Sequence, residues 1–99
     1  IISSVTAAIS LGAIPGGESS SVQTVAVSGL SRGDALFLTL DSIYHATDAN
    51  RDIAWQCSSS STAGEAHVWG INSTITSVTP TAATFVRLTR IKFGNFPAA

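Results

Sequence analysis

Two stretches in the middle of the chain alternate between apolar and polar positions and are separated by a turn. In residues 53–58, IAWQCS, the apolar Ile, Trp and Cys fall on one face of an extended strand. Residues 66–71, AHVWGI, place small residues on one face and the bulkier His, Trp and Ile on the other. Hydroxyl residues and a glycine at 59–64 provide the reversal. The pattern predicts a β-hairpin over 53–72, around which the other strands pair.

Four further stretches have the period or the composition of strands. They are residues 21–28, 35–43, 73–78 and 84–93, and turns rich in Gly, Asp, Pro or Thr separate them. The second is the most hydrophobic, so we expect it to be central. In the stretch 84–93, the apolar residues switch from one face of the strand to the other midway. A β-bulge at 87–89 would bring both halves onto the same face. With the N-terminal segment, this spacing predicts an all-β fold, an antiparallel β-sandwich or jelly roll of about seven strands.

The N-terminal residues have an apolar side and end at an abrupt break. Alternate apolar side chains at 3–14 suit an extended segment, with a helix as the alternative, and the Pro-Gly-Gly sequence at 15–17 predicts a hinge. We therefore divide the chain into an N-terminal arm and hinge, 1–17, and a β-sandwich domain, 18–99. So few apolar residues do not fold alone, so we expect the arm to leave its own body and pack on a neighbouring subunit. The expected assembly residues are Val5, Ala7, Ile9 and Leu11.

The chain has an unusually small share of charged residues. Charged residues make up 11% and apolar residues 44%, whereas a soluble monomer usually has about a quarter charged. We therefore expect much of the surface to be covered by copies of itself or by a partner. The formal net charge is −1, and alternation would split the clustered cations, Arg87, Arg90 and Lys92, between two faces of a strand. A nucleic-acid partner is not expected, because phosphate binding needs a basic stripe.

Catalysis has little support in the residue pattern. Nucleophilic catalysis needs a Ser or Cys with a His and an orienting acid. Cys57 and His67 are the one pair that the hairpin could bring near each other, but alternation gives them opposite faces. Because Cys57 is the single cysteine, no internal disulfide forms, and we expect a buried thiol. The sequence predicts neither an enzyme nor a cofactor, and no apolar run reaches the length of a membrane span.

A polar stretch between two predicted strands resembles the start of a calcium-binding loop. Asp48, Asn50 and Asp52 stand at alternate positions, where oxygen ligands can converge on one ion. However, Ile53 replaces the glycine that should follow, and Ser59 replaces the closing glutamate. The sequence favours a solvated turn and predicts no metal site.

Two short motifs have an ordinary structural explanation. Arg32-Gly33-Asp34 spells an integrin-type tripeptide, but glycine and aspartate before a strand are common turn residues. Asn72-Ser73-Thr74 is a glycosylation sequon, and we interpret it as a turn.

Aromatic residues near polar loops raise the alternative of carbohydrate binding. Tyr44, His45 and Arg51 form the expected ligand loop, because aromatic faces beside polar groups hold sugar rings. We nevertheless expect at least one of Trp55 and Trp69 to fill the core.

The order of these segments resembles small β-sandwich modules of tailed-phage virions, such as head decoration proteins, head fibres and tail-fibre tips. The similarity rests on Gly33-Asp34 before ALFLTL, then IAWQC, the Ser-rich turn, EAHVWGINST and the closing TPTAATFVRLTRIKF, over about residues 22–93. It implies a non-enzymatic, self-assembling and commonly trimeric protein of the virion or extracellular space. Its partners would be the major capsid protein or a fibre shaft. The chain also resembles H-type lectins, trimers that bind N-acetylgalactosamine, although their paired cysteines are missing here.

Overall fold

The fold consists of β-strands and connecting turns. The computed structural model describes residues 2–31, 33–40, 52–80 and 84–92, and none of these is helical. No helix in this part of the chain could therefore cross a membrane. The strands within it are β1 (Ile2–Ile9), β2 (Gln23–Ala26), β3 (Ala35–Leu40), β4 (Ile53–Ser59), β5 (Glu65–Asn72) and β6 (Thr84–Ile91).

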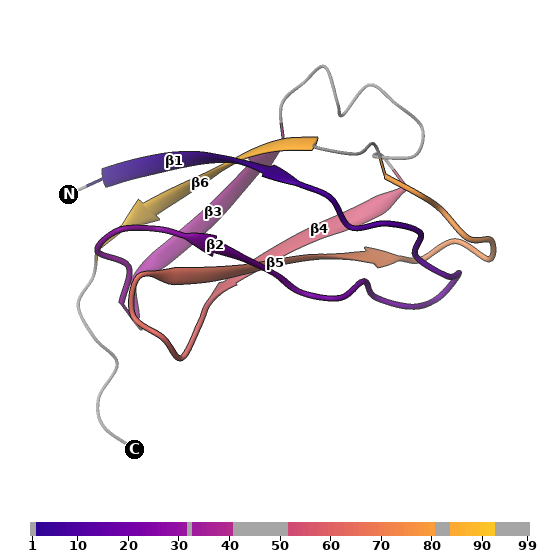
Figure 1. Cartoon of the computed structure of the whole chain (residues 1–99), viewed down its shortest axis with the longest axis horizontal. Helices are drawn as coiled ribbons and strands as arrows, with labels where there is room; N and C mark the ends of the chain where they lie inside the picture. Colours follow the sequence, from indigo (N-terminus) through magenta and orange to yellow (C-terminus); the bar gives the residue numbers. More distant parts are fainter. Residues whose placement is uncertain (1, 32, 41–51, 81–83, 93–99) are drawn as a thin grey trace.

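The strands form two antiparallel sheets with three strands each (Figure 1). One sheet has the order β1-β6-β3 and the other the order β2-β5-β4, so β6 and β5 are the central strands. The predicted all-β class is confirmed, and the architecture is compatible with a β-sandwich. Residues 73–77 form no strand, and Val78 makes only an isolated bridge to Ile14. The expectation that 35–43 is central is wrong for the described strands, among which β3 lies at the edge of its sheet.

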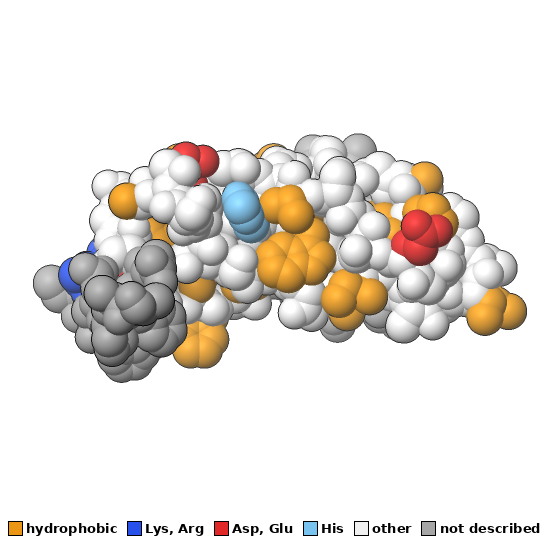
Figure 2. Space-filling view, turned by 90° about the horizontal axis from the view of Figure 1, so that it is seen from below, with side chains coloured by type: hydrophobic (Ala, Val, Ile, Leu, Met, Phe, Trp, Pro, Cys, Tyr) orange, Lys and Arg blue, Asp and Glu red, His pale blue; other side chains and the backbone are white. Residues whose placement is uncertain are grey.

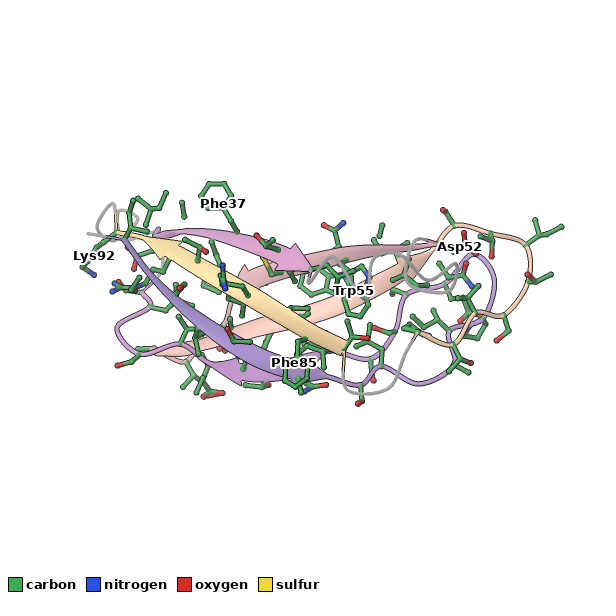
Figure 3. All side chains as sticks on the ribbon, turned by 90° about the horizontal axis from the view of Figure 1, so that it is seen from above. Phe37, Asp52, Trp55, Phe85 and Lys92 are labelled. Carbon is green, nitrogen blue, oxygen red and sulfur yellow. The ribbon has the colours of Figure 1, made fainter. Side chains whose placement is uncertain are left out.

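The hydrophobic core lies between the two sheets and draws side chains from both. Each fully buried aliphatic side chain contributes roughly 1.5–3 kcal/mol relative to exposure. Trp55, on β4, packs against this core, which confirms the prediction that at least one tryptophan fills it (Figure 3). The buried cluster consists of Ile9, Val86 and Leu88 from one sheet, Val25, Ala66 and Val68 from the other, and Val27 and Leu30 from the loop after β2.

The predicted hairpin is present, with β4 and β5 paired from Ile53↔Asn72 to Ser59↔Ala66. The small face of β5 points inward, and the bulkier face of His67 and Trp69 points outward. Gly70 shows why small residues are needed inside: a Cβ built there would lie 2.5 Å from Cγ2 of Ile53.

Strand β6 has no bulge, contrary to the sequence prediction. Its pairing with β1 runs without a break from Ile2↔Ile91 to Ile9↔Thr84, and its pairing with β3 is equally continuous. The change in parity arises because Phe85 and Ile91 face outward while Val86 and Leu88 are buried. The same alternation separates Arg87, which is exposed, from Arg90, which is only partly exposed, as predicted.

The N-terminal segment does not leave its own body, and the predicted arm is corrected accordingly. Residues 2–9 form an edge strand that pairs along its whole length with β6. Ile9 is 0% exposed, and the other three expected assembly residues pack against the core of the same chain. The apolar side chains that suggested an intermolecular contact are therefore accommodated by this chain's own second sheet. Whether the segment also contacts another subunit stays a prediction.

The Pro-Gly-Gly sequence forms a turn that is hydrogen-bonded to the rest of the fold. Gly17 has φ +77°, and the Glu18 amide donates to the Pro15 carbonyl, which closes a β-turn. The Gly17 amide donates to the Asn72 carbonyl at 2.8 Å, and a Cβ on Gly16 would lie 2.6 Å from the backbone of Ile75. These contacts hold the segment against the end of β5, so it does not act as a hinge.

Candidate functional site: the outer faces of the two sheets

The expected ligand loop and most of the calcium motif lie outside the described residues. This applies to Tyr44, His45, Asp48, Asn50 and Arg51. Asp52 is described and exposed, directly before β4. Among the described residues, no group of three or more His, Cys, Asp or Glu side chains could hold a metal ion. The loop predictions therefore stay predictions.

Cys57 and His67 lie on opposite faces of their sheet, as alternation predicts. The register pairs Cys57 with Val68 and Ser58 with His67, so the thiol faces the core and the imidazole faces outward. Burial raises the pKa of the Cys57 thiol. The Sγ atom lies 3.8 Å from the carbonyl oxygen of Leu36, on the other sheet. These two side chains cannot form a nucleophile and base pair in this fold.

The carboxylate of the integrin-like tripeptide is buried. Oδ2 of Asp34 accepts hydrogen bonds from the Ser31 backbone amide at 3.1 Å and from its hydroxyl at 3.2 Å. The side chains of Arg90 and Lys92 each approach it to 3.8 Å, and the Asp34 side chain is 0% exposed. A receptor cannot reach this carboxylate, which supports the interpretation as turn chemistry.

The asparagine of the sequon is also buried. Its Nδ2 donates to the carbonyls of Ile14 at 2.8 Å and Thr76 at 2.9 Å, so both amide hydrogens are used. Its Oδ1 accepts from the backbone amide and the hydroxyl of Thr74. A glycan on Nδ2 would break this network, so the structure supports the predicted structural turn at Asn72.

The outer face of β1-β6-β3 is nearly uncharged and carries exposed apolar side chains. Ile2 is 69% exposed, Phe37 53% and Phe85 43%. Phe37 projects away from the body of the molecule (Figure 3). Arg87 lies in the middle of this face, paired with Thr6 on β1 and Thr39 on β3, and is its one charged side chain among the described residues. Sequence reasoning did not bring Phe37 and Phe85 onto one face, because that assignment depends on how β6 pairs with β1 and β3.

The outer face of β2-β5-β4 combines an aromatic residue with neutral polar groups. Trp69 stands opposite Gln56, and His67 stands between Thr24 and Ser58. Directly opposed side chains have Cβ atoms about 4.5–5.5 Å apart, so one small ligand could contact several of them. Figure 2 shows a histidine side chain beside hydrophobic side chains, with acidic side chains toward the two ends of the view. The described cations, Arg87, Arg90 and Lys92, all belong to β6 or directly follow it.

No protein family model, curated protein or solved structure matches this chain.

Proposed function

We propose that this chain is a non-enzymatic structural module of a virion, a capsid decoration or fibre module that assembles with copies of itself and with other virion proteins. The observation that supports the proposal is the outer face of β1-β6-β3, where Ile2, Phe37 and Phe85 are exposed and Arg87 is the single charge among the described residues. Large exposed apolar patches mark contacts with proteins, membranes or ligands, and three large apolar side chains on one nearly uncharged face favour such a contact here.

Energetics favour covering this face. Burying one large apolar side chain that is now half exposed yields roughly 1 kcal/mol or more. Thr6 and Thr39 beside Arg87 can satisfy polar groups of a partner, and they add no charge that must be desolvated. For a face with this composition, burial against a permanent partner is more favourable than exposure to water.

The finer parts of the proposal rest on the resemblance to phage modules. They are a homotrimeric assembly, partners such as the major capsid protein or a fibre shaft, a virion or extracellular location, and a jelly-roll connectivity with a seventh strand.

Light scattering after size exclusion, over a series of protein concentrations, tests the proposal. The wild-type chain is expected to form an oligomer, and Phe37→Asp is expected to weaken it by placing a charge on the covered face. Ser61→Asp, in the exposed turn between β4 and β5, is the matched control and should leave the oligomer unchanged. A wild-type protein that stays monomeric at the highest concentration contradicts the proposal.

The second candidate function is the binding of a neutral glycan, and the face of Trp69 favours it. An indole ring beside the Gln56 amide, with the Thr24 and Ser58 hydroxyls flanking His67, offers a stacking surface and hydrogen-bonding groups for a sugar. The absence of Lys and Arg from the described part of this face argues for neutral rather than acidic sugars.

A glycan array tests this second function. Binding that is lost in Trp69→Ala but retained in Phe37→Ala, on the other sheet, would assign it to the β2-β5-β4 face. Binding that is lost instead in Tyr44→Ala, His45→Ala or Arg51→Ala would assign it to the expected ligand loop. An array without a hit contradicts glycan binding at the β2-β5-β4 face and at the expected ligand loop.

A further inference from the structure

A side chain that contacts the outer edge of β1 shows which of its residues direct their backbone groups toward β6 and which direct them away. We call this alternation the hydrogen-bonding phase of β1. The Gln23 amide donates from Nε2 to the Ala8 carbonyl at 3.2 Å, so this carbonyl points away from β6. In an antiparallel pair, both backbone groups of a residue point to the same side, and the side alternates along the strand. Ile2, Ser4 and Thr6, which share the parity of Ala8, therefore direct their backbone groups to the outer edge.

An observation at the opposite edge of the sheet gives the same phase. On β3, the Leu36 carbonyl points outward, where the Cys57 thiol contacts it. Leu36 pairs with Arg90 of β6, so the backbone of Arg90 must bond to its other neighbour, Ser3 of β1. Ser3 and Val5 are thus bonded to β6, and Ser4 and Thr6 are not.

Gln23 stands where the peptide group of a neighbouring strand would stand. Besides its bond to the Ala8 carbonyl, its Oε1 accepts from the Ser10 amide at 3.1 Å. Donating to one outward residue and accepting from the next is what a paired strand does, so the side chain caps one end of this edge. Among the described residues, no comparable cap is seen over Ile2, Ser4 and Thr6, and Figure 1 shows β1 at the margin of its sheet.

The composition of β1 gives this edge none of the usual protection against pairing. Natural edge strands avoid association by means of charged residues, proline or bulges. Its residues, ISSVTAAI, include no charge, proline or glycine, and its register with β6 has no bulge.

We propose that β1 pairs with β1 of a second copy of this chain, antiparallel and about a two-fold axis at Ser4. This register sets Ile2 opposite Thr6 of the other copy and Ser4 opposite Ser4. It uses all three uncapped outward residues and stops before Ala8, which Gln23 already caps. An isologous contact needs a self-complementary surface, and an uncharged strand meets no like charge across the axis.

This contact deepens the proposed function and rests on it. It joins two β1-β6-β3 sheets into one continuous sheet, whose outer faces together form a larger apolar surface. The first assembly step is then a dimer, in contrast to the trimer that the resemblance implies.

A proline scan along the two edges tests the contact. Ser4→Pro removes an amide that points to the outer edge and leaves the bonds to β6 in place, so it should weaken self-association at least tenfold. Thr24→Pro is the matched control on the β2 edge. The Val27 amide donates to the carbonyl of Gly64, directly before β5, so it points toward β5. Because the direction alternates along the strand, the Thr24 amide points away from β5, to the outer edge. This control should associate like the wild type.

A cross-link decides the matter if Ser4→Pro does not fold. Ser4→Cys in a Cys57→Ser background should give a disulfide-linked dimer on mild oxidation, because directly paired residues have Cα atoms about 5.5 Å apart. Thr24→Cys in the same background should not. A wild-type oligomer that tolerates Ser4→Pro, or that Ser4→Cys fails to cross-link, overturns the β1 contact and leaves the proposed function standing. A monomeric wild-type protein overturns both the β1 contact and the proposed function.

Discussion

The Nδ2 of Asn72 donates a hydrogen bond to the carbonyl of Ile14 at 2.8 Å, although 58 residues separate the two positions. The same side chain is 0% exposed and also joins the Thr74 and Thr76 backbones. One buried amide therefore connects the end of β5, the turn after it and the segment between β1 and β2.

Replacing this side chain should destabilise the whole fold. Asn72→Ala leaves the buried carbonyl of Ile14 and the amide of Thr74 without these partners, which should cost about 3 kcal/mol in the free energy of unfolding. Denaturant titration followed by tryptophan fluorescence measures this loss. Ser73→Ala, at the exposed neighbouring position, should change stability by less than about 0.5 kcal/mol. Equal effects of the two variants would contradict the assigned role of Asn72.

A methyl group at Gly70 should overpack the core. The added Cβ would meet Cγ2 of Ile53 at 2.5 Å, so Gly70→Ala should destabilise the protein by about 1–3 kcal/mol. Ile53→Ala removes the clashing atom. The double variant should therefore be less destabilised than the sum of the two single variants, by about 1 kcal/mol. Strict additivity in thermal or denaturant unfolding would mean that the two groups are not in contact.

The buried carboxylate of Asp34 should matter for stability, whereas one of its two cations should not. Asp34→Ala leaves Arg90 with hydrogen bonds to Ser3 and Gly29 but without its buried counter-charge, at an expected cost of about 3 kcal/mol. The Lys92 side chain is 46% exposed, so Lys92→Ala should cost less than about 1 kcal/mol. A larger loss for Lys92→Ala than for Asp34→Ala in chemical denaturation would reverse this assignment.

The Cys57 thiol predicts a loss of stability in alkaline solution. Burial holds its pKa above the ordinary value of 9.0, so the unfolded chain ionises first as the pH rises. The unfolded state then binds fewer protons than the folded state, and the free energy of unfolding falls above about pH 9. Cys57→Ser should remove this component of the pH dependence. If the two proteins lose stability in parallel between pH 8 and 11, the thiol is not responsible.

The hairpin was predictable because alternation and a Ser-rich turn occur together in one continuous stretch of sequence. The sequence could not predict that the small face of β5 points inward. That orientation depends on Trp55 and on leucines from β3, which already occupy the interior. Similarly, Pro-Gly-Gly indicates a hinge by composition. Only the approach of Gly16 to the Ile75 backbone shows that the turn is fixed in place.

The candidate surfaces depended on register, which composition alone does not determine. The scarcity of charge predicted a surface covered by a partner, which stays a prediction, and it did not show which side chains form that surface. The unbroken pairing of β6 with both neighbours brings Phe85, Arg87 and Phe37 onto one face. The backbone phase of β1 follows from the Gln23 amide, a contact between residues 15 positions apart that no local pattern reveals.

Amide hydrogen exchange along β1, followed by NMR at increasing protein concentration, tests the central claim of self-assembly most directly. At low concentration, Val5 and Ala7 should be protected through their bonds to β6, while Ser4 and Thr6 should exchange quickly. As the concentration rises into the range where light scattering reports an oligomer, Ser4 and Thr6 should become protected as well. Rapid exchange at these two amides in the assembled protein would contradict the account.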